Sequence, residues 1–282
     1  MLFKQIRKMH VKPIKMRWMT GGVNYSYLLS TQDSSQSWLI DPAEAMEVLP
    51  ALNSAEKSSI QAIVNTHHHY DHAGGNVAVL ASLKQTSNHP IKVIGGSRGS
   101  PAVTDIPKDL QHYKLGDLDI TSIRTPCHTQ DSVCYHVIDP ETNEQAIFSG
   151  DTLFTAGCGR FFEGTGEEMD AALNEKILKG VKEPNWGTTR VFPGHEYTTG
   201  NVEFIRKAIY PNVGDNKYFD ALEDYCHEHE VTTGKFTLYD ELMFNPFMRL
   251  DDKLVRKAIG DENCTWSRGR VMDQLRKMKN AA

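Results

Sequence analysis

Short apolar segments separated by turn residues dominate the first two-thirds of the chain. Gly, Pro, Asn, Asp or Ser bounds most of these segments, which is the pattern of β-strands. The expected strands cover residues 25–30, 37–41, 61–66, 91–96, 118–125, 132–139, 145–150 and 189–194. The segments 25–30 and 37–41 are near enough in sequence to form a hairpin.

Helical periodicity alternates with these strands and then replaces them. Residues 76–84 and 169–181 carry helical patterns between strands, which predicts an α/β arrangement. After His195 four further segments have helical periodicity with charged faces, and little there resembles a strand: 201–209, 216–230, 251–259 and 267–279. We therefore expect one domain over residues 11–195 and a smaller helical domain over residues 196–282.

The composition of the 282 residues is that of a globular protein, with 39% hydrophobic and 24% charged residues. The net charge of -5 argues against a surface dedicated to nucleic acid. No apolar run approaches the ~18 residues of a membrane helix. The cysteines are odd in number and form no C-x-x-C pair, which favours a reducing compartment. They are Cys127, Cys134, Cys158, Cys226 and Cys264.

The N-terminus is basic and allows two interpretations. Residues 1–30 contain no Asp or Glu, and apolar residues alternate with basic ones in "MLFKQIRKMH". A basic amphipathic segment over residues 1–10 is typical of a mitochondrial presequence and would place the protein in the mitochondrial matrix. The alternative is a cytoplasmic protein in which this segment is a short lead-in to a first strand, "VKPIKMRW".

Histidine and aspartate are concentrated directly after the expected strand 61–66. His67, His69, Asp71 and His72 form H-x-H-x-D-H within "THHHYDH". Three further candidates follow later strands: His128 in "TPCHT", Asp151 in "SGDT" and His195 in "PGHEY". Because strand ends in a layered α/β fold meet at one edge, we expect these seven side chains to lie together.

Their number and type suit two metal ions. We expect His67, His69 and His128 to bind one ion, and Asp71, His72 and His195 a second, with Asp151 between them. Positions left open for water are typical of catalytic rather than structural metal sites. His68 and Tyr70 alternate with the ligands and should point elsewhere. The scattered histidines should be ordinary surface or core residues: His89, His112, His136, His227 and His229.

This constellation resembles that of the metallo-β-lactamase superfamily, which implies an αβ/βα sandwich of two sheets flanked by helices. Longer motifs are similar to glyoxalase II, the hydroxyacylglutathione hydrolases, and closest to fungal members. They are "THHHYDHAGGN", "TPCHT", "FSGDTLFTAGCGRFFEGT", "PGHEYT" and "NPFMRL". The resemblance runs from about residue 11 to residue 282 and includes a helical, substrate-binding C-terminal domain.

The resemblance also implies residues that bind glutathione. Arg160 and Tyr197 match positions that contact the glutathione peptide, and Arg276 and Lys279 match an R-x-x-K pair. Arg276 and Lys279 are one helical turn apart, so they can face one anion. The alternative is that both are solvated surface charges, because the neighbouring Lys277 leaves the helical register of the pair ambiguous. Phe162 stands where many relatives have a tyrosine, so one hydroxyl contact is lost.

The implied reaction is hydrolysis of S-D-lactoylglutathione to D-lactate and glutathione by a metal-bridging hydroxide, the second step of methylglyoxal detoxification. Asp71 and Asp151 would be the catalytic carboxylates. An all-nitrogen-and-oxygen ligand set suits Zn²⁺ and also accepts Fe or Mn. Cys127 and Cys158 occupy no ligand position, which argues against a β-lactamase, and buried packing is their expected role. We expect a monomer that binds neither nucleic acid nor membrane.

Three other functions fit parts of the pattern. A persulfide dioxygenase shares the sandwich and histidines but uses one iron, and usually lacks the helical domain with R-x-x-K. A nuclease of the same superfamily should carry a basic surface or an added nucleic-acid domain. An inactive metal-binding scaffold should have lost ligands, yet every ligand is present here.

Overall fold

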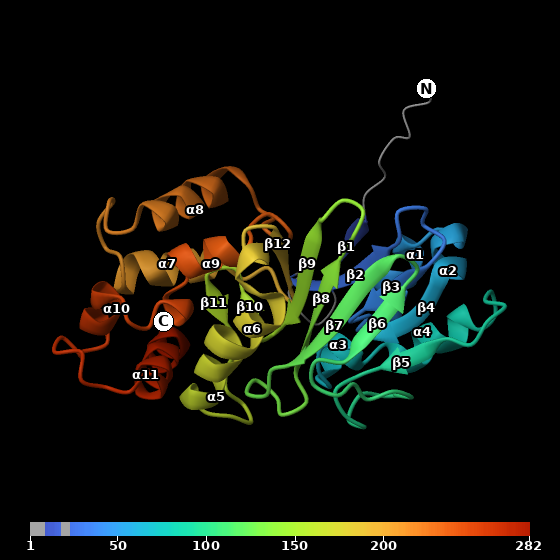
Figure 1. The fold of residues 1–282 in the computed structure, drawn as a ribbon, viewed down its shortest axis with the longest axis horizontal. Coiled ribbons are helices and arrows are strands. Elements are labelled where there is room, and N and C mark those ends of the chain that lie inside the picture. Colours follow the sequence, from blue (N-terminus) through green and yellow to red (C-terminus); the bar gives the residue numbers. More distant parts are fainter. Residues whose placement is uncertain (1–8, 18–22) are drawn as a thin grey trace.

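The computed structural model describes residues 9–17 and 23–282. In this part of the chain two five-stranded mixed sheets face each other, and helices cover their outer sides (Figure 1). The first sheet consists, in spatial order, of β1 (His10–Met16), β2 (Asn24–Ser30), β3 (Ser37–Ile40), β4 (Ile60–Val64) and β5 (Lys92–Ile94). Its β1–β2 and β2–β3 pairs are antiparallel, and β3–β4 and β4–β5 are parallel.

The second sheet has one parallel pair at its edge. Its strands, in spatial order, are β12 (Thr189–Pro193), β9 (Gln145–Gly150), β8 (Val133–Ile138), β7 (Leu118–Arg124) and β6 (His112–Leu115). Only β12 and β9 run parallel among these neighbours. A separate short hairpin follows β9 and consists of β10 (Leu153–Phe154) and β11 (Gly157–Cys158).

The helices fall into three groups. The first group lies with the first sheet: α1 (Ala45–Ala51), α2 (Ser54–Ser59), α3 (Tyr70–Ala73) and α4 (Asn76–Leu83). The second runs along the outer side of the second sheet: α5 (Gly166–Ala171), the π-helical turn η1 (Ala172–Ile177), α6 (Leu178–Val181) and η2 (Glu183–Asn185). The third is α7 (Thr198–Ala208), α8 (Lys217–Glu228), α9 (Leu238–Phe244), η3 (Pro246–Met248), α10 (Lys253–Ala258) and α11 (Arg268–Ala281).

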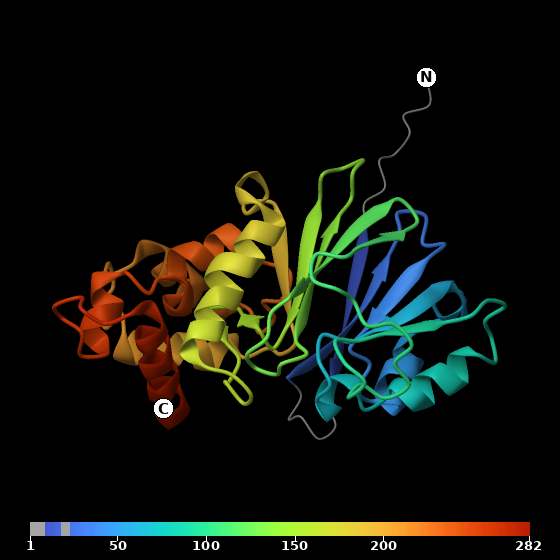
Figure 2. The same ribbon diagram turned by 60° about the horizontal axis from the view of Figure 1, so that its bottom comes forward.

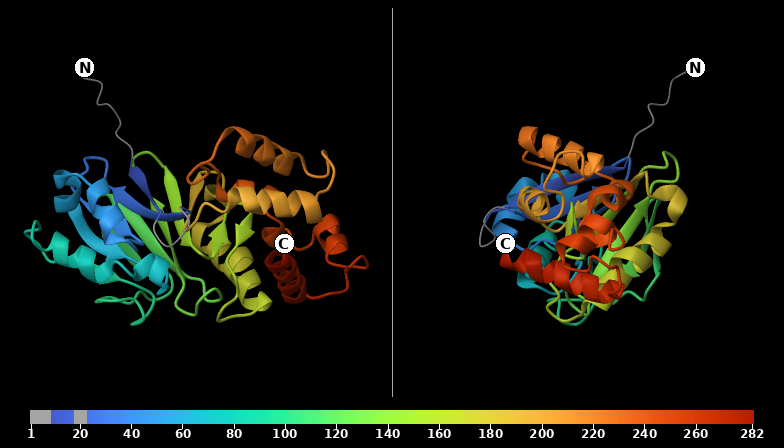
Figure 3. Two further views of the ribbon diagram at one scale, coloured as in Figure 1. Left: turned by 180° about the vertical axis from the view of Figure 1, so that it is seen from behind. Right: turned by 90° about the vertical axis from the view of Figure 1, so that its left-hand side faces the viewer.

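The third group of helices forms one end of the molecule, beyond α5 and α6 (Figure 2). Seen from behind, these helices remain gathered at that end, and in the view along the long axis they lie in front of the sheets (Figure 3). Local capping fixes where they begin: Asn216 caps α8, Ser267 caps α11, and Thr237 forms a capping box with Asp240 at α9.

Strand alternation divides the core into layers. Side chains at alternate positions of a strand point to opposite faces of the sheet. On β8, Tyr135 faces the layer between the two sheets, whereas Cys134 faces the layer under α5, α6 and the C-terminal helices. On β2, Tyr27 joins the layer between the sheets, and Leu28 packs under α1 and α4. The two sheets therefore share one core, and the C-terminal helices share another with the second sheet.

The strand and helix expectations are largely met, with differences at short elements. Strand β6, the hairpin β10–β11 and helices α1, α2 and α9 were not expected. The proposed N-terminal targeting segment lies mostly outside the described residues. Its last two positions, however, belong to the sandwich: Met9 is buried and His10 begins β1. Within the described residues no helix is long and apolar enough to cross a membrane.

Candidate metal centre and substrate cleft

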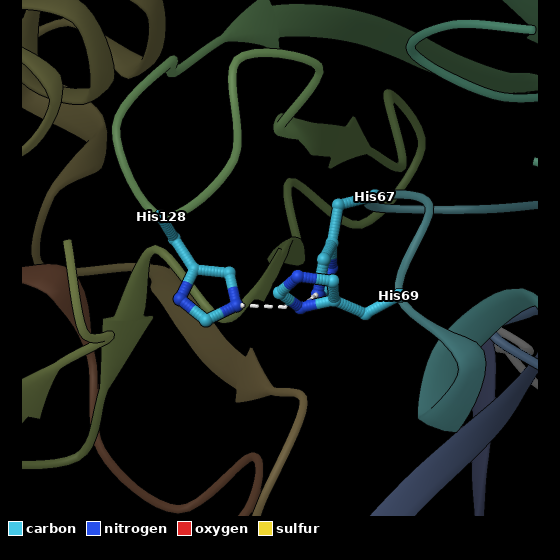
Figure 4. Close-up of side chains that lie close together, drawn as sticks. All are labelled: His67, His69 and His128. Carbon is cyan, nitrogen blue, oxygen red and sulfur yellow. Dashed lines mark hydrogen bonds between the residues drawn. The ribbon is translucent and has the colours of Figure 1, made fainter. Parts of the chain in front are cut away.

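The first group of candidate ligands comes from the loops after β4 and β7. His67 and His69 lie between β4 and α3, and His128 lies in the loop after β7. Nδ1 of His69 is 3.1 Å from Nε2 of His67 and 3.1 Å from Nε2 of His128. The three rings converge in Figure 4. Two nitrogens bound to one tetrahedral cation lie roughly 3.3 Å apart, so this spacing fits a shared ion.

The second group lies beside the first. Asp71 and His72 belong to α3, and His195 follows β12. Nε2 of His72 is 3.2 Å from Nε2 of His195, and Oδ2 of Asp71 is 3.6 Å from the same nitrogen of His195. This group offers one oxygen and two nitrogens within 4.8 Å of one another, which is again the size of a single cation site.

Asp151 lies between the two groups. Its Oδ1 is 3.2 Å from Nε2 of His72, and its Oδ2 is 3.2 Å from Nε2 of His195 and 3.5 Å from Nε2 of His128. The carboxylate is buried, and its Oδ1 has no well-formed hydrogen bond among the described residues. A buried acceptor without a partner is rare unless an ion or water satisfies it. The seven side chains therefore fit a centre for two cations.

Close backbone packing brings the strand ends to this point. Gly150 ends β9 with a φ of +50°, and a side chain there would meet Thr66 at 2.3 Å. Gly194 directly follows β12, the strand beside β9, and a Cβ at this position would lie 2.5 Å from Asp151 Oδ1 and 2.6 Å from Cε1 of His72. Glycine at both positions lets the loops that carry the ligands approach each other.

Hydrogen bonds on the far side of two imidazoles orient the rings. Nδ1 of His72 donates to Oδ2 of the buried Asp41 at 2.9 Å, and Nδ1 of His128 donates to the carbonyl of Arg160 at 2.9 Å. Both rings thereby direct Nε2 into the centre. Asp41 also accepts hydrogen bonds from the backbone N–H and from the Oγ1 hydroxyl of Thr66. Asp41 was not among the residues expected at the site, although an acidic residue directly after the buried strand "SWLI" was a usable signal.

Burial keeps the first histidine group neutral. It lowers the pKa of His67, His69 and His128, and neighbouring histidines lower it further. Their nitrogen lone pairs are therefore available to a cation at neutral pH.

The second group has a different electrostatic character. Burial alone would raise the pKa of Asp151, but His195 and His72 outweigh it and hold the pKa well below its usual range. Burial alone would lower the pKa of His72, but Asp151 and Asp41 outweigh it and raise the pKa. The Asp151 carboxylate is therefore ionised where a cation would sit.

A cleft of about 880 Å³ opens over the centre. It is lined by candidate ligands from both groups and by all five residues that the family resemblance implies for glutathione binding. The candidate ligands are His69, Asp71, His128, Asp151 and His195; the other five are Arg160, Phe162, Tyr197, Arg276 and Lys279.

One wall of the cleft is cationic. Nη1 of Arg276 donates to the Cys158 carbonyl at 2.7 Å, and Nζ of Lys279 donates to the Gly200 carbonyl at 2.5 Å. Lys277 lines a different pocket, beside α5 and the start of α11. The helical register that was ambiguous in the sequence is therefore resolved, with Arg276 and Lys279 both at the cleft.

Two aromatic rings lie against the candidate ligands. The Phe162 ring is 60% exposed, and its centroid lies 5.6 Å from that of His69 and 5.2 Å from that of His128, in edge-to-face geometry. The Tyr197 ring stacks on His195. Both rings can contact a substrate and one face of the centre at once.

The residues expected to lie outside the ligand groups do so. His68 turns away and its Nδ1 lies 2.8 Å from Oδ1 of Asp131, while Tyr70 is 63% exposed. Cys127 and Cys158 are both buried, as expected for packing residues.

Two family profiles match the chain. The metallo-β-lactamase superfamily matches residues 19–195, and the profile described as hydroxyacylglutathione hydrolase C-terminus matches residues 196–282. The crystal structure of ETHE1 from Myxococcus xanthus has a TM-score of 0.60 at 19% identity and covers 97% of this chain and 99% of its own, which supports the fold. The sandwich, the centre of seven candidate ligands and the metallo-β-lactamase profile together define a metallohydrolase of the metallo-β-lactamase type.

Full-length relatives narrow the class. The mitochondrial hydroxyacylglutathione hydrolase of Saccharomyces cerevisiae is 64% identical over 99% of both chains. The cytoplasmic isozyme from the same organism is 63% identical over 96% of this chain and 99% of its own. The chain belongs to the hydroxyacylglutathione hydrolase family. Its similarity to the isozymes of the two compartments is nearly equal.

Proposed function

We propose that this enzyme hydrolyses S-(2-hydroxyacyl)glutathione thioesters, with S-D-lactoylglutathione as substrate and D-lactate and glutathione as products. The observation that carries the proposal is the cleft itself, in which a centre for two cations faces a wall with cationic side chains. A thioester carbonyl at the centre and a carboxylate of glutathione at Arg160, Arg276 and Lys279 would use both features.

We infer that two divalent cations occupy the centre, one held by His67, His69 and His128, the other by Asp71, His72 and His195, with Asp151 between them. Nitrogen and oxygen ligands suit Zn²⁺, with Fe or Mn as alternatives. When bound, such cations act as Lewis acids and bring the pKa of a water molecule toward neutrality.

Asp71 and Asp151 are the carboxylates that would act on the attacking water. The side chain of Asp71 is 41% exposed and lines the cleft, so its oxygen can accept a hydrogen bond from a water beside the substrate. Asp151, which is buried and ionised, also lines the cleft. Expulsion of the leaving group needs little help, because a thiol of pKa about 8.5–9 departs as a thiolate.

The remaining residues would bind the peptide part of the substrate. Arg160, Arg276 and Lys279 present positive charge to a carboxylate, and such charge-assisted hydrogen bonds are the stronger kind. Phe162 and Tyr197 offer apolar ring surface between that wall and the centre. We assign residues 11–195 to catalysis and residues 196–282 mainly to substrate binding.

The test is hydrolysis of S-D-lactoylglutathione by purified protein, followed as loss of thioester absorbance, with metal content measured on the same sample. Rapid turnover with about two metals per chain supports the proposal. Oxygen uptake with a glutathione persulfide and one iron per chain would indicate a persulfide dioxygenase instead. Full metal loading with neither activity would indicate a scaffold that has lost catalysis.

We also propose that the protein acts as a monomer. On the basis of its basic N-terminus, we propose further that it is located in the mitochondrial matrix. Light scattering of the purified chain tests the first statement. Removal of residues 1–8 from a tagged protein tests the second, because import should be lost while catalysis persists; an unchanged distribution would favour the cytoplasm.

A further inference from the structure

The hairpin β10–β11 connects the two parts of the site. It begins just after Asp151 and ends just before Arg160. Gly159 follows the hairpin and is closely packed. A Cβ at this position would lie 2.0 Å from the carbonyl oxygen of Asp151 and 2.9 Å from Nδ1 of His128. The Arg160 carbonyl accepts from that same nitrogen of His128. Any shift of the hairpin therefore moves both the Arg160 side chain and the hydrogen bond that orients His128.

Side chains of the C-terminal helices hold the backbone of this hairpin. Each of four successive residues in it makes a hydrogen bond to a side chain of α7, of α9, of Asn245 at the C-cap of α9, or of α11. The contacts are Asn201 Nδ2 to Thr155 O (2.9 Å), Ala156 N to Glu241 Oε2 (3.0 Å), Asn245 Nδ2 to Gly157 O (3.1 Å) and Arg276 Nη1 to Cys158 O (2.7 Å).

Glu241 is the unusual member of this set. It is fully buried, and its Oε2 accepts from both Ala156 N and Asn245 Nδ2, while its Oε1 has no hydrogen-bond partner among the described residues. Stability alone would favour an apolar residue in such a place. Ala156 supplies a reason for the carboxyl, because its φ of +56° is a strained conformation for a residue with a Cβ.

We propose that Glu241 is a positioning residue for thioester hydrolysis: its buried carboxyl holds the Ala156 turn, and through the hairpin it sets Arg160 against the substrate and His128 at the metal centre. The inference rests on the proposed function for its kinetic consequences only. Its structural consequences, in the hairpin and at the centre, can be measured without any substrate.

The charge state of Glu241 suits this role. Burial raises its pKa to about 8, with Asp240 adding to the rise and the hydrogen bonds from Asn245 and Ala156 opposing it. A neutral carboxyl still accepts two hydrogen bonds at Oε2. Glutamine keeps such an acceptor with the same shape, whereas methionine fills the same length without one. These two substitutions therefore separate hydrogen bonding from packing.

The experiment compares Glu241→Gln and Glu241→Met with Leu238→Ala. Leu238 is buried in the same core on the same helix but has no polar side chain, so its truncation lowers stability without removing a hydrogen bond to the hairpin. Three quantities are measured below the Tm of every variant. They are KM and kcat for S-D-lactoylglutathione, amide exchange of residues 152–160, and the chelator concentration that removes half of the bound metal.

We expect Glu241→Met to raise KM about tenfold with a smaller change in kcat, to speed amide exchange in the hairpin, and to release metal at about tenfold lower chelator concentration. Glu241→Gln should stay within about threefold of the unmodified enzyme in all three. Leu238→Ala should lower the Tm and leave the kinetic constants, the amide exchange of the hairpin and the metal retention unchanged.

Glu241→Met with unchanged KM, exchange and metal retention overturns the proposal, and so does Leu238→Ala with the same changes as Glu241→Met. If Glu241→Met does not fold, Glu241→Leu replaces it, because leucine also removes the acceptor for Ala156 N; unchanged KM, exchange and metal retention in that variant would likewise overturn the proposal. An unmodified enzyme that does not cleave the thioester contradicts the proposed function, while exchange and metal retention still decide the role of Glu241.

Discussion

The Tyr197 ring lies parallel to the ring of His195, with 4.6 Å between the centroids and 5° between the planes. Tyr197 is also the N-cap residue of α7 and lines the cleft. The Tyr197 side chain thus lines the cleft and covers a candidate metal ligand at the same time.

Tyr197→Ala should weaken metal binding, because His195 loses the ring that restricts its orientation. We expect half of the metal to be lost at about tenfold lower chelator concentration, the range typical of residues that orient ligands. Tyr197→Phe keeps the ring and should retain metal, with only a modest rise in KM. Equal metal loss in both variants would assign the effect to the hydroxyl rather than to stacking.

Asp151→Asn should abolish turnover and reduce metal content, because Asp151 is the carboxylate that approaches histidines of both groups. We expect kcat to fall by at least about a hundredfold. Metal analysis and turnover on one sample measure both effects. Asp117→Asn, in the exposed turn between β6 and β7, is the matched control. Near-normal turnover of Asp151→Asn would contradict the two-metal assignment.

KM should depend on pH through Lys279. Burial, and then the charge of Arg276, lower the pKa of Lys279 to about 8. Below that pH the ammonium attracts a substrate carboxylate, and above it the attraction is lost, so KM should rise as the pH passes through about 8. Lys279→Arg stays charged and should give a flatter KM profile from pH 7 to 9. Lys277→Arg should leave the profile unchanged, and the same profile in Lys279→Arg would show that another group titrates.

Phe162→Tyr should lower KM. The ring is exposed at the cleft, so an added hydroxyl can reach the substrate without disturbing the edge contacts to His69 and His128. One neutral hydrogen bond contributes about 0.5–1.5 kcal/mol, which corresponds to roughly two- to tenfold in KM. Steady-state kinetics measure this, with kcat expected to stay constant. A higher KM would show that the hydroxyl meets no acceptor in the bound substrate.

Stability should fall with rising pH because of Glu241. Its folded-state pKa of about 8 is raised above the usual 4.5. The folded state therefore binds the proton more tightly than the unfolded state. This contribution is fully present below pH 4.5 and is lost as the pH rises through about 8. We expect the free energy of unfolding of the unmodified chain to fall relative to Glu241→Gln by a few kcal/mol between pH 5 and pH 9, on the order set by that shift. Urea titrations at pH 5, 7 and 9 measure the difference, and parallel pH profiles would contradict it.

The clustering of the seven candidate ligands was predictable because each of them follows the end of an expected strand. H-x-H-x-D-H directly follows a buried strand, and His128, Asp151 and His195 each follow another, so the rule that strand ends meet at one edge sufficed. Long strands such as 24–30 and 145–150 were equally clear. The five cleft residues came from resemblance to a family, and the structure brings all of them to one cavity.

Features that depend on tertiary contacts could not be predicted in this way. Helix α9 is short, so its periodicity is weak, and β6 ("HYKL") has too few apolar residues to read as a strand. The role of Glu241 rests on the backbone N–H of Ala156 that folds against it, and no spacing in the sequence encodes that contact. The hairpin β10–β11 is held by side chains from residues 201 to 276, which only the folded chain brings together.

The wide sequence separation of the ligands has a consequence for how the protein is made. His67 leaves the ribosome long before His195, and β12, which carries His195 at its end, pairs in parallel with β9. Contacts of such long range form late in folding. A nascent chain therefore cannot complete the second ligand group until β12 has been synthesised and has docked. His67, His69 and His128 all precede β12, so the first group can come together earlier. Filling of the second group is then a closing step of biogenesis.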